Sequence, residues 1–216
     1  FKLNPFYLIK MRETKQELFW EGKFGIEYIS INQSANIDAA NIQLFSEIFG
    51  KLLFKPKSFI ELGANIGNNL KAIKTICPTC KTIGVEINST AAKILEESDF
   101  CDLTINETLF DIDSSQYISD ISMTKGVLIH INPKFLDKAL DILYRSSRKY
   151  ILLIEYFNPT PVEVIYRGHE KKLFKRDFAR DLMKRYTDLT LIYYGFKYNG
   201  DKLFPQDDLT WFLLSK

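Results

Sequence analysis

The strongest chemical signal in the sequence is a glycine-containing turn that follows a short apolar segment. Gly63 and Gly67 lie in the run Glu61-Leu62-Gly63-Ala64-Asn65-Ile66-Gly67, at the point where a strand would lead into a helix. Glycine permits a sharp turn there and lets a ligand approach the backbone closely. Glu86, 19 residues beyond Gly67, ends the next apolar segment, where a carboxylate can accept both hydroxyls of a ribose. The spacing predicts a site for a nucleoside-containing cofactor; the alternative is a tight turn and a strand-end acid with no ligand.

Two side chains of this turn distinguish between cofactors. Glu61 precedes the turn, and its carboxylate suits a cationic, ammonium-bearing cofactor while it repels a phosphate. Asn65 occupies the place where dinucleotide-binding turns usually have glycine, and its side chain would crowd a pyrophosphate. Asparagine still tolerates the left-handed backbone that such a turn needs. The residues therefore favour S-adenosylmethionine over NAD.

A long segment, residues 156–174, carries several side chains that could hold an acceptor. Arg167 can bind a carboxylate or phosphate through two parallel hydrogen bonds, and His169 can remove a proton from a hydroxyl. The two residues are two apart, so in an extended chain they would point the same way. Tyr156, Asn158 and Tyr166 complete the predicted acceptor-binding set. The alternative is a solvated basic loop.

Two further residues compete with His169 as the catalytic base. His130 follows the fourth predicted strand, close to the expected cofactor edge, although it could equally make a local hydrogen bond at a helix start. Asp208 belongs to an Asp207-Asp208 pair between the last two predicted strands, where the alternative role is turn formation. His169, His130 and Asp208 are thus the three candidate bases.

The composition excludes several other classes of protein. The net charge is only +2, which predicts no strong attraction to nucleic acid, and no apolar run is long enough to span a membrane. Three cysteines and no recognisable signal peptide predict a reducing, cytoplasmic environment. Cys77 and Cys80 form a CxxC motif, but no second ligand pair follows, so no metal site is expected.

The elements that must position these residues alternate between strands and helices. Strands are expected at 58–62, 82–87, 103–106, within 121–129, and at 150–155, 189–198 and 209–215; helices are expected at 13–20, 36–49, 66–76, 89–97, 132–147 and 174–186. Nearly continuous apolar strands separated by helices predict a doubly wound α/β fold around a mostly parallel sheet. Residues 1–50 are expected to form a helical extension or lid and 51–216 the cofactor-binding domain. Such sheets bind ligands beyond the carboxyl ends of their strands.

The pattern E-x-G-x-x-x-G, followed by an acid at the end of the second strand, resembles the class I S-adenosylmethionine-dependent methyltransferases. The resemblance implies a seven-stranded Rossmann-like sheet whose last strand is antiparallel. It implies that Gly63 and Gly67 line the methionine and ribose, that Glu86 holds the ribose hydroxyls, and that a residue near 109–111 faces the adenine. The predicted cofactor-binding set is Glu61, Gly63, Asn65, Gly67, Glu86, Asp111 and Lys125.

A narrower resemblance covers nearly the whole chain. The runs FWEGKFGIEY (19–28), ELGANIGNNLKA (61–72), KGVLIHINP (125–133), IEYFNP (154–159), YRGH (166–169), FKRDF (174–178) and FPQDDLTWF (204–212) are similar to the pseudaminic acid biosynthesis-associated methyltransferases. That resemblance implies a small acceptor, an acidic or nucleotide-linked sugar of the nonulosonic acid class, methylated on oxygen or else on nitrogen. The open alternatives are a methyltransferase for an unrelated metabolite or glycan, and a non-catalytic S-adenosylmethionine-binding regulator.

Overall fold

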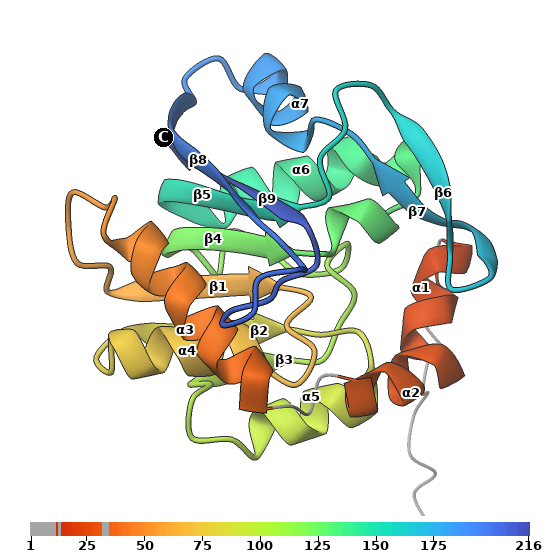
Figure 1. Ribbon diagram of the computed structural model, residues 1–216, viewed down its shortest axis with the longest axis horizontal. Coiled ribbons are helices and arrows are strands. Elements are labelled where there is room, and N and C mark those ends of the chain that lie inside the picture. The colour runs from red at the N-terminus through yellow and green to blue at the C-terminus, as the bar shows by residue number, and fades with distance from the viewer. Residues whose placement is uncertain (1–11, 13, 32–34) are drawn as a thin grey trace, which may run out of the picture.

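A seven-stranded sheet with helices on both faces forms the centre of the protein in the computed structural model, which describes residues 12, 14–31 and 35–216 (Figure 1). The strand order is β3-β2-β1-β4-β5-β9-β8, and only β9 runs antiparallel to its neighbours. The strands are β1 (Ser58–Leu62), β2 (Lys81–Val85), β3 (Leu103–Ile105), β4 (Ser119–Lys125), β5 (Ser147–Glu155), β8 (Thr190–Lys197) and β9 (Leu209–Ser215). The predicted doubly wound, mostly parallel α/β fold is confirmed.

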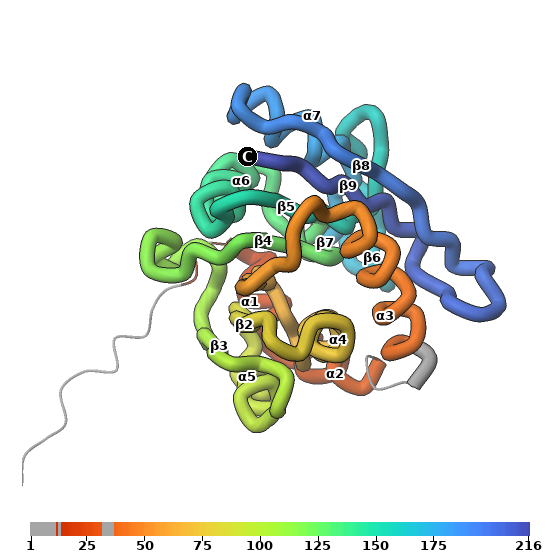
Figure 2. Tube along the Cα trace, turned by 90° about the vertical axis from the view of Figure 1, so that its left-hand side faces the viewer, coloured from red at the N-terminus to blue at the C-terminus, as the bar shows by residue number. Residues whose placement is uncertain are grey.

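Two apolar cores lie on the two faces of this sheet. Helices α3 (Ala35–Phe49), α4 (Asn68–Ile76) and α5 (Ser89–Glu96) cover one face, and α6 (Leu136–Arg145) and α7 (Phe178–Arg185) cover the other (Figure 2). Successive residues of a strand point to opposite faces, so in β5 Ile151 packs under α6 and α7 while Leu152 packs under α3 and α4. A strand buried on both sides has to be apolar throughout, which is why its sequence lacks alternation.

A β-hairpin replaces part of the connection that the sequence analysis left without structure. Strands β6 (Val162–Tyr166) and β7 (His169–Lys175) form a separate two-stranded sheet. Arg167 and Gly168 join them in a two-residue turn with φ angles of 49° and 84°, a left-handed backbone suited to tight hairpins. The helix predicted from residue 174 was therefore wrong at its start. It begins at Phe178, where Asp177 caps it by accepting a hydrogen bond of 2.9 Å from the amide of Arg180.

Two short helices precede α3 and lie beside the hairpin (Figure 1). Helix α1 (Lys15–Glu21) begins at a capping box in which Thr14 and Glu17 satisfy each other's backbone amides. Residue 13, the predicted start of this helix, lies outside the described residues, as do residues 1–11 and 32–34 of the predicted extension. Helix α2 (Lys23–Ile31) was not predicted. No helix of the described chain is long and apolar enough to cross a membrane.

The connection after β4 also differs in detail from the expectation. The predicted helix 132–147 consists of a short 3-10 turn, η2 (Pro133–Phe135), followed by α6. Another 3-10 turn, η1 (Leu128–His130), occupies residues that the sequence placed at the end of the fourth strand. Both turns leave the carboxyl edge of the sheet, so their side chains reach the region where the ligand is expected.

Candidate functional site

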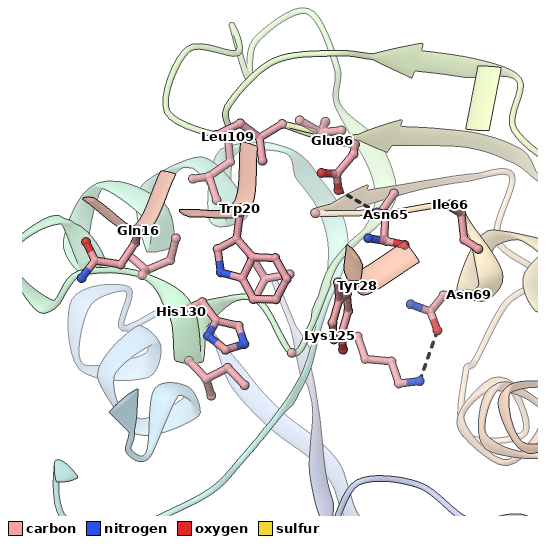
Figure 3. Close-up of a pocket in the computed structure, with 18 of the residues that line it drawn as sticks. Gln16, Trp20, Tyr28, Asn65, Ile66, Asn69, Glu86, Leu109, Lys125 and His130 are labelled. Atoms are coloured by element: carbon pink, nitrogen blue, oxygen red, sulfur yellow. Dashed lines mark hydrogen bonds between the residues drawn. The ribbon is translucent and has the colours of Figure 1, made fainter. Parts of the chain in front are cut away.

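A cavity of about 320 Å³ opens beyond the carboxyl ends of β1, β2 and β4. Helices α1 and α2 supply side chains to its other walls (Figure 3), and so does the β6–β7 hairpin. Its lining residues include Trp20, Tyr28, Asn41, Gly63, Asn65, Asn69, Glu86, Lys125, His130, Tyr156, Tyr166, Arg167, Gln206 and Asp207. The cavity has two parts, which we name the cofactor half, around Gly63 and Glu86, and the acceptor half, around Trp20 and His130.

The glycine turn forms the floor of the cofactor half. Gly63, Asn65 and Gly67 all have left-handed backbones, with φ angles of 81°, 49° and 86°. A Cβ atom on Gly63 would lie 2.6 Å from a methyl carbon of Val127, and one on Gly67 would lie 2.4 Å from a methyl carbon of Leu95. At both positions glycine is therefore required for two reasons, the left-handed backbone and the lack of room for a Cβ atom. Gly63 lines the cavity, whereas Gly67 faces the core instead.

Glu86 stands at the end of β2 with its carboxylate fixed by two backbone amides. One carboxylate oxygen accepts a hydrogen bond of 2.7 Å from Asn65, and the other accepts one of 2.7 Å from Asn88. Burial raises the pKa of Glu86, and these two bonds oppose that shift. Each carboxylate oxygen has further lone pairs, so the group can still accept hydrogen bonds from a ligand.

A buried polar network lies beside the glycine turn, and Figure 3 shows part of it. Glu61 accepts a hydrogen bond of 2.6 Å from the side-chain amide of Asn69, and its other oxygen is buried without a partner in the described chain. Lys125 donates to Asn69 at 3.3 Å and to Asn41 at 2.7 Å. Burial raises the pKa of Glu61 to about 8 and lowers that of Lys125 to about 8. Lys125 lines the cavity, while Glu61 lies behind the turn.

The segment after β3 covers the far end of the cofactor half. Glu107, Thr108, Leu109 and Phe110 line the cavity, as expected for a wall against a flat base. Asp111, which was predicted to bind the cofactor, does not line the cavity. Its carboxylate lies 3.8 Å from the guanidinium of Arg12.

Aromatic rings form the walls of the acceptor half. Trp20 of α1 lies with its ring centroid 4.7 Å from that of His130 and 5.1 Å from that of Tyr28. Tyr166 of the hairpin lies 4.7 Å from His130 on another side, and Tyr156 follows β5. Apolar faces with polar edges are suited to a ligand that combines a ring with hydroxyl groups.

His130 is held in one tautomer by the hairpin. Its Nδ1 lies 2.5 Å from the carbonyl oxygen of Lys172, and because a carbonyl only accepts, Nδ1 carries the proton. Its Nε2 then has a free lone pair. Burial lowers the pKa of His130 to about 4, so the ring is neutral near pH 7. A neutral imidazole at the cavity wall can accept a hydrogen bond from a hydroxyl.

The structure separates Arg167 from His169. Arg167 lines the cavity, whereas His169 is exposed outside it, and its ring lies 4.9 Å from that of Phe19 of α1. The common direction expected for an extended chain does not hold, because the turn at Arg167 and Gly168 reverses the chain between them. Of the three candidate bases, His130 alone lines the cavity.

Two other predicted site residues lie just outside the cavity. Asn158 is directed to the carbonyl oxygen of Thr160, to which its side chain donates at 2.6 Å. Asp208 accepts a hydrogen bond of 2.9 Å from the amide of Asn199 and so stabilises the loop between β8 and β9. Its neighbour Asp207 lines the cavity instead.

A buried carboxylate that was not predicted as a site residue shapes the wall after β4. Glu155, at the end of β5, accepts hydrogen bonds of 3.1 Å from the amides of both Val127 and Leu128. These amides begin η1, so the carboxylate fixes the turn that carries His130. Burial raises the pKa of Glu155 to about 7. An acid ending an otherwise apolar strand was the available signal.

Asn41, Asn69 and Gln206 were also missed. Gln206 of the β8–β9 loop donates to Asn41 at 3.0 Å, so that loop joins the network of Lys125. Asn69 lies within the glycine-turn run and could have been singled out there. Asn41 lies in unremarkable sequence far from the turn. Gln206 lies within the run 204–212, but no local pattern there indicates a contact with Asn41.

The cysteines lie away from the cavity. Cys77 and Cys80 are free thiols buried in the core under α3 and α4, and Cys101 is also free. Burial raises the pKa of Cys80 to about 12, which keeps its thiol protonated. Within the described residues, no group of three or more His, Cys, Asp or Glu side chains could hold a metal ion.

Comparison with known proteins identifies the fold. No protein-family model matches the chain, and no curated protein matches it either. A SAM-dependent methyltransferase from Leishmania major is 12% identical, with a TM-score of 0.69 over 93% of this chain and 81% of its own. The Burkholderia thailandensis 1,6-didemethyltoxoflavin-N1-methyltransferase is 10% identical, with a TM-score of 0.63 over 89% and 83%. The plantazolicin methyltransferase BpumL is 13% identical, with a TM-score of 0.63 over 93% of each chain. The protein therefore has the fold of the S-adenosylmethionine-dependent methyltransferases.

Proposed function

We propose that this protein is an S-adenosylmethionine-dependent methyltransferase that acts on a small acceptor. One observation carries the proposal: the glycine turn, Glu86 and the aromatic walls around His130 line the same cavity, in a fold shared with such enzymes. A cofactor and a second molecule can therefore meet there. S-adenosylmethionine supplies a methyl group activated by its sulfonium.

The cofactor half provides groups that suit each part of this cofactor. Glu86 offers carboxylate oxygens to the ribose hydroxyls, and residues 107–110 offer a wall to the adenine. Lys125 lines the cavity, and its ammonium can pair with the carboxylate of the methionine end, while Asn69 joins Lys125 to Glu61 behind the turn. Gly63 leaves room for close approach to the backbone.

The acceptor half favours a ring-shaped molecule with an anionic group. Trp20, Tyr28 and Tyr166 supply flat faces, and Arg167 is the cation at the mouth. Arg167 holds its left-handed φ of 49° at a turn position where asparagine or glycine would cost less, which favours a role for its side chain. An acidic or nucleotide-linked sugar, the acceptor class implied by the sequence resemblance, meets both requirements.

Methyl transfer to a hydroxyl requires a group that receives its proton. His130 is the candidate placed for this role, because its Nε2 is unprotonated and its ring packs against those of Trp20 and Tyr166. The low pKa makes His130 a weak base, so its first contribution is to orient the hydroxyl by accepting its hydrogen bond.

Calorimetric titration with S-adenosylmethionine, S-adenosylhomocysteine and NAD tests the cofactor assignment. We expect both sulfur compounds to bind and NAD not to bind. Failure of both sulfur compounds to bind would remove the proposed function.

Acceptor profiling with methyl-labelled cofactor then tests the acceptor class. Nonulosonic acids and nucleotide-linked sugars should take up label in the presence of the wild-type protein. His130→Gln should lower the rate by about 10²-fold, whereas the matched variant His169→Gln should leave it unchanged. Cofactor binding without label transfer to any acceptor would favour the non-catalytic regulator.

A further inference from the structure

One buried amide joins the cofactor half to the helix that carries Trp20. Asn88 is 1% exposed, and its side-chain oxygen accepts hydrogen bonds of 3.1 Å from the amides of Thr90 and Ala91, which caps the start of α5. Its side-chain nitrogen donates to the carbonyl oxygens of Trp20 at 3.2 Å and Glu21 at 3.0 Å. These carbonyls belong to the last turn of α1, where no intrahelical donor is available. Asn88 therefore caps two helices at once.

The backbone of α2 packs closely over this amide. Gly25 of α2 lies directly over it: a Cβ on Gly25 would lie 2.8 Å from the side-chain nitrogen of Asn88 and 1.8 Å from the carbonyl oxygen of Trp20. The junction between α1 and α2 thus packs against Asn88 through backbone atoms. Because this packing is close, a shift of Asn88 should move the junction as well.

The backbone of Asn88 is in turn bound to the predicted ribose acid. Its amide donates to Glu86 at 2.7 Å, and the other oxygen of Glu86 accepts from the glycine turn at Asn65. A ligand that hydrogen-bonds to Glu86 therefore also restrains the segment that carries Asn88. At the other end of this connection, the Trp20 ring lies 4.7 Å from His130 in the acceptor half.

We propose that Asn88 is a positioning residue that couples cofactor occupancy to the placement of Trp20 in the acceptor half. Hydrogen bonds from the ribose hydroxyls to Glu86 would restrain residues 86–88. The side chain of Asn88 then holds the end of α1, and α1 in turn positions the ring of Trp20. The inference rests on the proposed function, since it requires the cofactor to bind at Glu86. By linkage, a ligand in the acceptor half should strengthen cofactor binding by the same factor.

Trp20 provides a signal that does not depend on turnover. The protein has two tryptophans, and the other, Trp211, is 2% exposed in the core, so it reports whether the core is intact. Iodide quenching of fluorescence should be measured with and without S-adenosylhomocysteine, while calorimetry measures binding in the same samples. In the wild type we expect S-adenosylhomocysteine to lower the quenching of Trp20 about twofold or more. Trp20→Phe should abolish this change.

Two substitutions separate the two capping roles of Asn88. Asn88→Asp and Asn88→Ser both keep a side-chain oxygen that can cap α5, but neither keeps the amide hydrogens that reach α1. Both variants should bind S-adenosylhomocysteine within about threefold of the wild type, yet show no change in Trp20 quenching. Asn106→Asp is the matched control, because the side chain of Asn106 donates at 2.8 Å to the carbonyl oxygen of Glu86 and not to α1. It should behave as the wild type.

The outcomes distinguish this inference from the proposed function. Protection of Trp20 that persists in both Asn88 variants would overturn the coupling, as would a wild type that binds S-adenosylhomocysteine without any change at Trp20. If calorimetry detects no binding to the wild type, the proposed function itself fails and the inference fails with it.

Discussion

The two halves of the cavity are built in different ways. The cofactor half is made mainly from residues 61–69 and 86–88, two short stretches at the ends of neighbouring strands, and much of it is backbone. The acceptor half is made of side chains from α1, α2, η1, the hairpin and the β8–β9 loop, which lie far apart in the sequence. A site made of local backbone leaves a motif in the sequence, whereas one made of distant side chains does not.

The sharpest way to break the cofactor half is to alter its turn. Gly63→Val adds a side chain where φ is 81° and where a Cβ would lie 2.6 Å from a methyl carbon of Val127, so we expect at least about 100-fold weaker binding of S-adenosylhomocysteine by calorimetry. Gly168→Val is the control, since Gly168 has a similar φ of 84° but open space around it. It should bind normally. If both variants lose affinity for S-adenosylhomocysteine equally, backbone strain alone would explain the loss.

Replacing Glu86, the acid of the cofactor half, should weaken cofactor binding by a smaller amount. Glu86→Gln keeps the shape of the side chain but removes the charge that favours two ribose hydroxyls, so binding should weaken by about 1–3 kcal/mol. The measurement is again calorimetric, with thermal melting to confirm that the variant folds. Unchanged affinity in a folded variant would show that the ribose does not lie on Glu86.

One buried group in each half, His130 and Glu61, should contribute to the pH dependence of folding stability with opposite signs. His130 in the acceptor half has a pKa lowered to about 4 by burial. Between pH 6.5 and 4 its imidazole is therefore protonated in the unfolded chain but neutral in the folded chain. Folding stability from this group is therefore lost as pH falls. Glu61 in the cofactor half has a pKa raised to about 8, so between about pH 4.3 and 8 the folded chain keeps a proton that the unfolded chain releases. Its contribution is lost as pH rises.

Urea denaturation at several pH values below 8 separates these contributions. His130→Gln should flatten the loss of stability on acidification, by an amount on the order of 2–3 kcal/mol at pH 4.5. Glu61→Gln should flatten the loss towards pH 7.5 by a similar order. The matched controls are His169→Gln and Glu96→Gln, at two exposed residues. They should leave the loss of stability towards pH 4.5 and towards pH 7.5 unchanged. If either buried variant follows the wild-type curve, the burial argument for that group is wrong.

The smallest expected effect concerns the hairpin turn. Arg167→Asn relieves a left-handed backbone that arginine adopts reluctantly, so the protein should become more stable by about 0.5–1 kcal/mol in thermal melting. Lys171→Asn relieves a similar φ of 57° outside the cavity and serves as the control for stability. If Arg167 binds the acceptor, only Arg167→Asn should raise the Michaelis constant for an acceptor found by labelling. A Michaelis constant unchanged in Arg167→Asn would remove that role.

The sequence was sufficient for the fold and for most of the cofactor half. Apolar strands alternating with helices predicted the doubly wound sheet, and the structure confirms it. Glu86, Gly63 and Asn65 line the cavity as their motif predicted, while Asp111 does not, because a position in a loop depends on which residues the loop turns inwards. Cofactor binding at these residues stays a prediction.

The acceptor half was harder to predict, for physical reasons. The charged strand β7 has little apolar alternation, and Arg167-Gly168 departs from the Asn-Gly usual in two-residue turns, so the hairpin was missed. Because the turn was not predicted, His169 was expected to point the same way as Arg167. Asn88 was passed over because its role depends on contacts with α1, 66–68 residues away in the chain.

The position of β9 has a consequence for how the chain is made. Strand β9 follows β8 in sequence but lies between β5 and β8, and it supplies the only strand partner of β8 in the described sheet. Until the ribosome has released residues 209–215, the apolar strand β5 has a bare backbone edge, which is a template for aggregation. That edge of β5 therefore stays open to pairing with other chains until β9 has joined the sheet.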